Sequence, residues 1–498
     1  MNDPGTGRLN WLLPTALLLT VPAFGGNVVT AQPRPAGLAE RLVNEYSTAK
    51  SAGITRGACV SPDLKRLAYV HVRMLDRRGE MVEECRVVCD GEPTKRTYTS
   101  VHPLHFSAGG LHFAYEAERG RTVFWVLDGR EIPNSEHLAF SPDGNHVAYV
   151  LHRRDGDVMV VDGKAVPHVF KKIPGPVFSP DSRHLAYRGS TGRSLSTSGF
   201  SVVVADGRAE PEFPEVTTPP TYSPNSRLMA YGVSEKRGWS VKVGEHSLPA
   251  GGVVAQVLFA PDSRSLAFST VRRTPTDRGL MAEKHMFVKW QDTEWGPYDH
   301  VACMVFSPDA RRLAFVVKTG MKWRVVCDGI EGPDFREAWI PQFSPDGRHL
   351  AYVAFDEKHE PLVVRDGIKG PADPRDVTWL RFSPDSQHLA YVRRERANFP
   401  GGFVCDGLSS PFPKGVTEIS WLRFSPDSKH LAYVFGRHRV VVDGLRGPSH
   451  ARILMPGRWD AVPGKLQYLV VGTKRASLVE VDWPTDRTWE DAFKAAGK

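Results

Sequence analysis

The residues of this chain that could carry chemistry are histidines and aspartates that recur at intervals. A histidine next to a carboxylate can act as a general base or as a metal ligand. One histidine precedes Leu or Val in each of five similar segments, at His146, His184, His349, His388 and His430. Five copies tens of residues apart are typical of a structural repeat, so we predict no metal site and no catalytic residue among them.

The repeated aspartates are likewise predicted to be structural residues of the repeat. One set follows Ser-Pro, and a second set precedes Gly at Asp90, Asp128, Asp162, Asp206, Asp328, Asp366, Asp406 and Asp443. Aspartates in turns accept hydrogen bonds from nearby backbone N–H groups. We therefore expect the Ser-Pro-Asp carboxylates to stabilise their own turns.

The six cysteines do not form a recognisable site. Cys89, Cys327 and Cys405 precede Asp-Gly, where Val442 stands in another copy, and this indicates a core position. Two cysteines four residues apart on one strand are separated by about 13 Å, too far for a disulfide, and this excludes a bond between Cys85 and Cys89. No Cys-x-x-Cys spacing indicates zinc. We predict free, packed thiols, with no metal and no cofactor; the remaining two are Cys59 and Cys303.

Motifs of known catalytic sites are absent from the sequence. There is no Gly-x-Ser-x-Gly nucleophile motif, no His-Glu-x-x-His motif and no phosphate-binding glycine loop. Residues outside the repeat, such as Glu294 and Glu337, would be the acids to test if turnover were found. The sequence thus predicts no catalytic residues and a chain that is not an enzyme.

The elements that position these residues are units of about 40 residues, a period typical of propeller blades. Each unit is marked by Ser-Pro-Asp or a close variant, at Pro62, Pro142, Pro180, Pro224, Pro261, Pro308, Pro345, Pro384 and Pro426. Two more worn copies, near Phe106 and Val462, bring the expected total to about eleven.

Each unit is expected to contain four short strands. Ser-Pro-Asp-Gly has the preferences of a type I turn, and Asp-Gly after a β-branched run indicates a tight hairpin. The second strand, His-Leu-Ala-Tyr-Val at 430–434, is apolar on both faces. A sheet covered on both sides requires such a strand, and blades stacked around a ring provide that cover.

This Phe-Ser-Pro-Asp-Gly/Ser-x-His-Leu-Ala-Tyr-Val repeat resembles the TolB-like, WD40-like (PD40) β-propeller repeats of exported bacterial proteins. The resemblance covers roughly residues 51–485 and implies an all-β propeller. Because eleven units exceed the four to eight that are usual in one ring, we predict two successive propellers that divide near 250–290. One large ring is the alternative.

The flanking segments complete the predicted organisation. Residues 1–31 resemble a signal peptide, because an apolar run precedes the small residues Val29-Thr30-Ala31. Residues 32–50 have apolar side chains at helical spacing, and residues 486–498 should form a helical tail. The units at 189–199 and 270–284 carry longer loops. The mature protein is therefore expected to be periplasmic or extracellular.

The function predicted from these features is that of an exported, non-catalytic propeller that binds protein partners in the cell envelope. The alternative is a propeller enzyme or saccharide-binding protein with a site at a channel mouth, where Trp379 and Trp421 are candidates, although core packing is favoured for both. The net charge of +8 is spread along the chain, so no nucleic acid is expected. We also expect a monomer with no membrane span.

Overall fold

A computed structural model describes most of the repeat region. The residues described are 40–47, 54–63, 65–77, 80–192, 199–274, 283–339, 341–373, 375–394, 401–412, 419–436, 438–450, 452–455, 465–471, 475–486 and 488–496. The predicted signal peptide lies outside them, as do parts of both predicted loops, at 193–198 and 275–282. No helix in the described ranges is long and apolar enough to cross a membrane.

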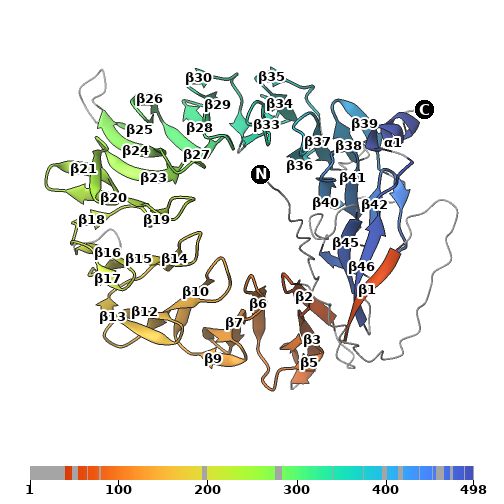
Figure 1. Ribbon diagram of the computed structural model, residues 1–498, viewed down its shortest axis with the longest axis horizontal. Coiled ribbons are helices and arrows are strands. Elements are labelled where there is room, and N and C mark those ends of the chain that lie inside the picture. The colour runs from red at the N-terminus through yellow and green to blue at the C-terminus, as the bar shows by residue number, and fades with distance from the viewer. Residues whose placement is uncertain are drawn as a thin grey trace, which may run out of the picture. The chain divides into compact units, whose positions relative to one another are not determined.

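The described residues form eleven antiparallel sheets of four or five strands, which follow one another around a ring (Figure 1). The first six blades are β2 (Ile54–Val60), β3 (Leu67–Arg77), β4 (Glu80–Cys89), β5 (Glu92–Pro93); β6 (Ser100–Phe106), β7 (Phe113–Arg119), β8 (Thr122–Leu127), β9 (Arg130–Ile132); β10 (Ser135–Phe140), β11 (Val147–His152), β12 (Asp157–Val161), β13 (Lys164–Phe170); β14 (Pro176–Phe178), β15 (Leu185–Ser190), β16 (Ser201–Ala205), β17 (Arg208–Ala209); β18 (Glu215–Val216), β19 (Thr221–Tyr222), β20 (Met229–Glu235), β21 (Gly238–Val243), β22 (His246–Pro249); and β23 (Val253–Phe259), β24 (Leu266–Thr274), β25 (Glu283–Trp290), β26 (Thr293–Tyr298).

The next four blades and the closing sheet complete the ring. They are β27 (His300–Phe306), β28 (Leu313–Thr319), β29 (Lys322–Cys327), β30 (Ile330–Glu331); β31 (Glu337–Ala338), β32 (Gln342–Phe343), β33 (Leu350–Phe355), β34 (Pro361–Arg365), β35 (Ile368–Lys369); β36 (Val377–Phe382), β37 (Leu389–Arg393), β38 (Gly402–Cys405), β39 (Leu408–Pro411); β40 (Ile419–Phe424), β41 (Leu431–Phe435), β42 (Arg439–Val442), β43 (Leu445–Arg446); and β44 (Arg452–Met455), β45 (Lys465–Val471), β46 (Arg475–Asp482), with β1 (Glu40–Ser47). Helix α1 (Trp489–Ala496) lies in the predicted helical tail.

The closing sheet shows that the eleven blades belong to one ring. Strand β1 pairs antiparallel with β46, so the sheet order is β1-β46-β45-β44 and the N-terminal strand completes the last blade. The predicted split near 250–290 is wrong, because β23–β26 form an ordinary blade there. The predicted helix within 32–50 is also wrong. Its apolar spacing fits a helix, but pairing with β46 overrides that local preference.

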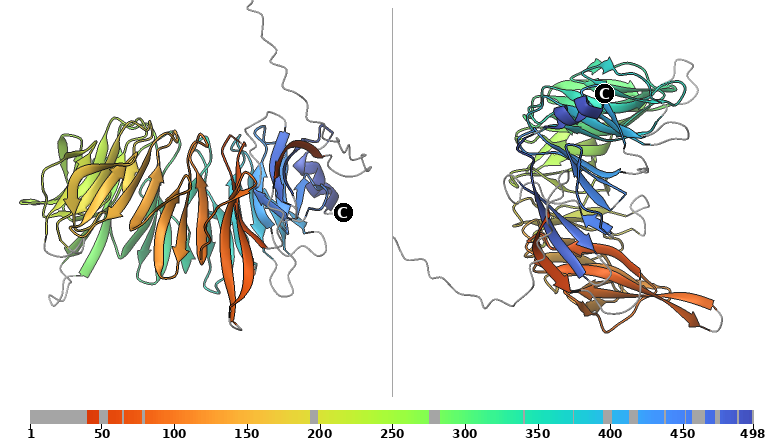
Figure 2. Two further views of the ribbon diagram at one scale, coloured as in Figure 1. Left: turned by 90° about the horizontal axis from the view of Figure 1, so that it is seen from below. Right: turned by 90° about the vertical axis from the view of Figure 1, so that its right-hand side faces the viewer.

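The cores of the ring lie between neighbouring sheets, which stand side by side (Figure 2). Between β36–β39 and β40–β43, for example, Phe403 and Cys405 pack against Leu431 and Tyr433. The second and third strands of each blade supply the most buried side chains, as the two-sided apolar pattern predicts.

The Ser-Pro-Asp turns hold themselves closed, as predicted from the sequence. In one blade Ser141 Oγ accepts the His146 N–H at 2.9 Å and donates to Asp143 Oδ1 at 2.5 Å, and Asp143 also accepts the Asn145 N–H at 3.0 Å. The Ser141 hydroxyl and the Asn145 N–H together lower the pKa of Asp143 to about 2. The same contacts recur at the Ser-Pro-Asp turns that begin with Ser61, Ser179, Ser307, Ser344, Ser383 and Ser425, so each of these turns is a small, self-sufficient unit.

A second set of hydrogen bonds joins neighbouring turns. In several blades a serine follows Ser-Pro-Asp in a left-handed conformation, and its hydroxyl accepts the Asp N–H of the preceding turn. Such bonds link Asp143 to Ser182, Asp181 to Ser226, Asp346 to Ser386 and Asp385 to Ser428, at 2.9–3.0 Å. These repeated residues therefore tie blades together.

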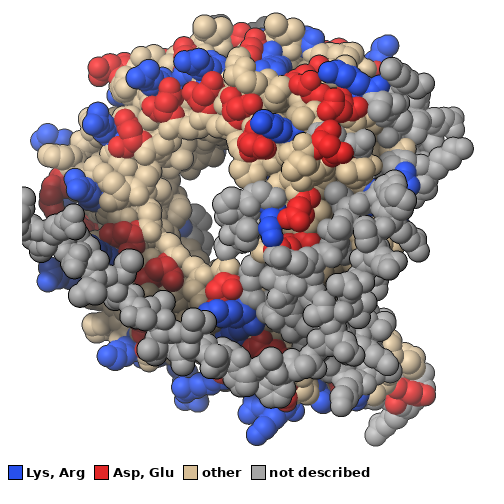
Figure 3. Space-filling model, turned by 45° about the vertical axis from the view of Figure 1, so that its right-hand side comes forward, with Lys and Arg blue, Asp and Glu red and all other residues tan. Residues whose placement is uncertain are grey.

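The first strand of each blade lies nearest the centre of the ring (Figure 1), and most of these strands are interrupted by a bulge. The register shifts fall at Arg56/Cys59, Val101/Leu104, Glu136/Ala139, Val254/Gln256, Val301/Met304, Thr378/Arg381 and Ile419/Trp421. Bulges redirect side chains and are frequent next to functional sites. The face in Figure 3 shows an opening through the ring, with Lys and Arg interspersed among Asp and Glu.

Candidate functional site

The repeated histidines are paired with carboxylates inside their own blades. In each pair the imidazole Nδ1 contacts one oxygen of the Asp-Gly aspartate, while its other oxygen accepts the next backbone N–H. The pairs are His112–Asp128, His146–Asp162, His184–Asp206, His349–Asp366, His388–Asp406 and His430–Asp443, at 2.6–2.8 Å. Each pair ties the hairpin between the third and fourth strands to the turn that precedes the second strand, which is a structural role.

Arginine replaces this histidine in two blades, next to a cysteine. Arg312 Nε donates to Asp328 at 3.0 Å, and its Nη2 lies 3.1 Å from Cys327 Sγ. Burial and the adjacent Asp328 raise the pKa of the Cys327 thiol to about 11. The same arrangement recurs at Arg66 and Cys89. All six cysteines are thiols outside any disulfide, as predicted, and these two thiols stay protonated at neutral pH.

A different group of titratable side chains lies in the blade β10–β13. His152 ends β11 and directly faces Asp157, the first residue of β12. The imidazole Nδ1 is 2.6 Å from Asp157 Oδ1, and its Nε2 is 3.3 Å from Glu136 Oε2 on the innermost strand β10. His137 and Lys172 approach the same Glu136 oxygen at 3.5 and 3.6 Å. This acid–base cluster lies at the opposite end of the sheet from the Asp162-Gly163 turn.

The local backbone explains how the acid–base cluster forms. The bulge between Glu136 and Ala139 places His137 in a left-handed conformation, with φ 55°. On the adjoining hairpin, Gly156 has φ 149°, and a Cβ there would lie 2.3 Å from the Phe170 carbonyl oxygen. Only glycine therefore fits this turn, which brings Asp157 back beside His152.

Burial separates the roles of the two carboxylates in the acid–base cluster. The Asp157 side chain is 9% exposed and accepts the Ile173 N–H at 3.0 Å, so its position is fixed. The Glu136 side chain is 51% exposed, and that of His152 is 32% exposed. A buried aspartate that orients a histidine, with a second, exposed carboxylate at the far nitrogen, is an arrangement that can transfer protons.

Sequence reasoning missed the acid–base cluster. The sequence pattern pointed to histidines before the second strand and to residues in long loops, whereas His152 is the last residue of the second strand and stands outside the repeat pattern. The available signal was that His152 and Asp157 flank Arg153–Gly156, a hairpin short enough to make them cross-strand partners. The contacts of Glu136 and Lys172 depend on the bulge and on the next connection, which the sequence does not reveal.

The two tryptophans that the sequence offered as candidate site residues, Trp379 and Trp421, lie in different surroundings in the structure. Trp421 is buried in the core beside Ala432 and Val434, as core packing predicts. Trp379 is only partly buried, has φ 58° in the bulge of β36, and lines a cavity of about 220 Å³ with Trp339 and Arg381. The cavity lies where the innermost segments of two neighbouring blades meet.

The acids named from sequence have structural partners. Glu294 forms a two-point ion pair with Arg272, at 2.8 and 2.6 Å. Glu337 accepts the indole N–H of Trp339 at 2.9 Å. Among the residues that the structure describes, no group of three or more His, Cys, Asp or Glu side chains could hold a metal ion.

No protein-family model matches this sequence, and no curated protein matches it. Solved structures do resemble it. Porphyromonas gingivalis dipeptidyl peptidase 4 is 14% identical, with a TM-score of 0.33 over 67% of this chain and 64% of that chain. A prolyl endopeptidase structure is 15% identical, with a TM-score of 0.28 over 60% of this chain and 54% of that chain. The β-propeller domain of the Trilobed protease from Pyrococcus furiosus is 12% identical, with a TM-score of 0.28 over 66% of this chain and 100% of that domain.

These likenesses are likenesses of fold. The all-β propeller predicted from the repeat is confirmed. The chain spans less than two thirds of the dipeptidyl peptidase and of the prolyl endopeptidase that it resembles. Because these similar proteins are peptidases or part of a protease, they contradict two sequence predictions, that the chain is a non-catalytic scaffold and that it is not an enzyme. Neither prediction is retained, and the resemblance to TolB-like repeats stays a prediction.

Proposed function

We propose that this chain is an enzyme that works by general acid–base catalysis at the acid–base cluster of Glu136, His152 and Asp157. The observation that supports this function is the placement of His152 between a buried and an exposed carboxylate, at 2.6 and 3.3 Å, beside the innermost strand. The repeated His–Asp pairs clip hairpins, whereas His152 contacts a second carboxylate, that of Glu136, through its Nε2.

The proposed chemistry is hydrolysis with water as the nucleophile. With its Nδ1–H donated to Asp157, His152 accepts a proton at Nε2 from a water that takes the place of the Glu136 contact, as the water oxygen attacks a carbonyl carbon. Asp157 stabilises the imidazolium that forms. The same Nε2 proton then passes to the leaving group as its bond to the carbonyl carbon breaks. The Lys172 ammonium, 3.6 Å from Glu136, adds positive charge on the side of the cluster where an oxyanion would develop.

The direct experiment compares His152→Gln with the unchanged protein on panels of peptide and ester substrates, which carry the carbonyl carbon that the proposed step requires. Loss of a general base costs on the order of 10²–10⁴-fold in rate, so we expect His152→Gln to lose turnover by that factor. His146→Gln is the matched control, because it breaks a repeated pair with Asp162. Turnover that His152→Gln leaves unchanged, or no turnover of any substrate by the unchanged protein, would contradict the proposal.

A second candidate function is saccharide binding at the cavity lined by Trp339 and Trp379. The specific observation is two indoles on adjoining innermost segments, with Arg381 and Gln342 beside them. Aromatic faces with nearby planar polar groups suit sugar rings. Calorimetric titration with oligosaccharides should give heats that Trp339→Ala abolishes, and heats that survive this change would remove the candidate.

Export is part of the proposal. The predicted signal at 1–31 and the resemblance to TolB-like repeats support an enzyme that acts in the periplasm or outside the cell. Mass spectrometry of the secreted protein should find a mature chain that begins near Gln32. An intact Met1 in a cytoplasmic pool would contradict this placement.

A further inference from the structure

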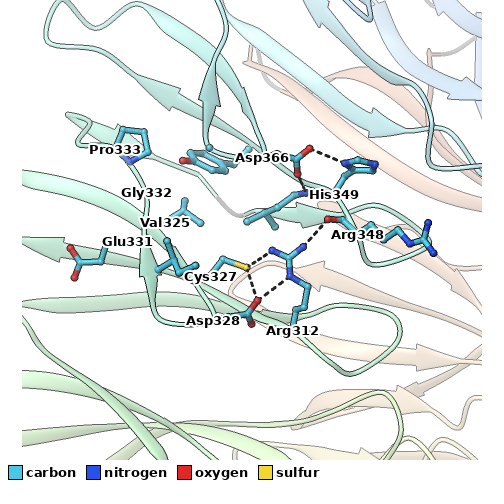
Figure 4. A pocket seen from close by; sticks show the side chains of 14 residues that line it. Arg312, Val325, Cys327, Asp328, Glu331, Gly332, Pro333, Arg348, His349 and Asp366 are labelled. Carbon is cyan, nitrogen blue, oxygen red and sulfur yellow. Dashed lines mark hydrogen bonds and ion pairs between the residues drawn. The ribbon is translucent and has the colours of Figure 1, made fainter.

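A groove of about 630 Å³ opens between the neighbouring blades β27–β30 and β31–β35 (Figure 4). One wall carries Arg312, Cys327 and Asp328, and the other carries His349 and Asp366. The remaining lining residues are Val325, Ile330, Glu331, Gly332, Pro333, Arg348, Leu350, Tyr352 and Gly367. We call this cavity the open groove. It combines an apolar floor with charged edges.

The same place two blades further on is occupied by the chain's own helix α1. Trp489 donates its backbone N–H to the Lys429 carbonyl and its indole N–H to the Ser428 carbonyl, both at 3.2 Å. The Trp489 ring meets His388 edge-on, with 4.9 Å between centroids. Trp489 and Phe493, four residues apart, are 3% and 8% exposed. We call this site the α1 groove.

The two grooves are built from the same positions of the repeat. In the α1 groove, His388, Cys405 and Asp406 stand where Arg312, Cys327 and Asp328 stand in the open groove. On the facing blade, Lys429, His430, Leu431, Tyr433 and Gly444 correspond to Arg348, His349, Leu350, Tyr352 and Gly367. The repeat therefore places equivalent residues around both grooves.

The exposed edges of the two grooves differ as expected from the presence or absence of a covering helix. Ile330, beside the open groove, is 77% exposed, whereas Leu408 at the same position beside α1 is 46% exposed. Cys405 is buried, whereas Cys327 is only partly buried. The residue that directly follows Asp-Gly, Ile330 in the open groove, is charged in four earlier blades, at Glu92, Arg130, Lys164 and Arg208. The apolar edge thus belongs to the later blades.

The open groove differs from the α1 groove at one repeat position, where Arg312 stands in place of His388. Arg312 Nη1 donates to the carbonyls of Gly347 and Arg348, at 3.4 and 2.8 Å. These are the counterparts of the Ser428 and Lys429 carbonyls that accept from Trp489. The Arg312 guanidinium thus occupies the acceptors that a docked tryptophan would use, and it weakens the site for such a helix without filling the cavity.

We propose that the open groove binds an amphipathic helix of a partner protein, with two aromatic residues four positions apart and an acidic first turn. The model for this ligand is α1 itself, in which Glu490 and Asp491 form the first turn. The side chains of Arg348 and Arg312 would lie near that turn. Arg348 is 85% exposed and has a long, 4.0 Å contact with Asp346, and charge complementarity favours such a partner.

A labelled peptide with the sequence of residues 485–498 tests the proposal on the full chain. Fluorescence anisotropy should show binding that Ile330→Asp weakens at least tenfold. Ile368→Asp is the matched control, because Ile368 holds the same position one blade further on and is 75% exposed. Arg312→His installs the residue of the α1 groove and frees both carbonyls, so it should tighten binding about tenfold, equivalent to about 1.4 kcal/mol.

A photo-crosslinking residue at the Phe493 position of the peptide locates the contact. Crosslinks to residues 325–352 support the proposal, whereas crosslinks confined to 403–444 would show exchange with α1 and overturn it. Failure of the peptide to bind either the unchanged chain or Arg312→His would also overturn it. Light scattering tests the alternative that a second copy of this chain occupies the open groove. A dimer that Trp489→Ala abolishes would assign the groove to that second copy and not to a partner protein.

Discussion

Replacing Trp489 with alanine should release helix α1 and expose Cys405. Large-to-small changes of a buried Trp cost about 3–5 kcal/mol, and Trp489 is 3% exposed within the core that also contains Cys405. A helix as short as α1, with eight residues, is not stable in water by itself. Loss of this anchor should therefore detach the helix while the blades beneath it stay folded.

The assay is alkylation of the native protein, followed by mass spectrometry of each cysteine. A docking free energy of about 3–5 kcal/mol corresponds to a change of roughly 100- to 5,000-fold in the opening equilibrium, so Cys405 should react faster by up to that factor. Burial also raises the pKa of the Cys405 thiol, which keeps it protonated and slow until α1 leaves. Cys327, which has no helix over it, is the internal reference.

Lys494→Ala is the control on the same helix, since Lys494 is exposed and pairs only with Glu490 on the surface. It should change the rate at Cys405 by less than about threefold, because such surface pairs contribute less than ~0.5 kcal/mol. The reasoning is refuted if Cys405 reacts as fast as Cys327 in the unchanged protein. It is also refuted if hydrogen exchange shows α1 detached in Trp489→Ala while Cys405 stays protected.

Three further predictions concern the ring. Deletion of residues 464–498 removes the partner of β1, so amide hydrogen exchange should speed up in 54–89 at the other end of the chain; unchanged protection there would contradict a single ring. The pKa values of Asp63, Asp143, Asp181, Asp309 and Asp346 are lowered, chiefly by serine hydroxyl bonds. Their stabilising effect is present above the unfolded pKa of about 3.9 and is lost as the pH falls towards 2; urea unfolding that is flat over this range would refute it. A thiol count on denatured, unreduced protein should find all six cysteines, and two or fewer would contradict the structure.

Much of the fold could be predicted from the sequence because its determinants are local. The Ser-Pro-Asp and Asp-Gly turns close through bonds within a few residues, as at Ser141 and Asp143. Ring closure could not be predicted, since it depends on β1 meeting β46 across more than four hundred residues. Apolar spacing around Leu42 fits a helix equally well, so local pattern gave the wrong element there.

The candidate site was less predictable than the fold. The repeat pattern made histidines such as His146 the first candidates for chemistry, and their role is structural. The proposed chemistry lies instead at His152, where the blade departs from its repeat. Its partners are brought together by a hairpin, a bulge and the start of the next blade, and their register cannot be read from residue types alone.

A double-mutant cycle on His152 and Asp157 tests the central claim most directly. kcat/KM is measured for the unchanged enzyme, for His152→Gln, for Asp157→Asn and for the double variant, each checked for an unchanged Tm. If Asp157 acts by orienting His152, the double variant should be no slower than His152→Gln within about threefold, because residues that act as a unit are not additive. Independent, additive losses, or full activity in all three variants, would contradict an acid–base site at this position.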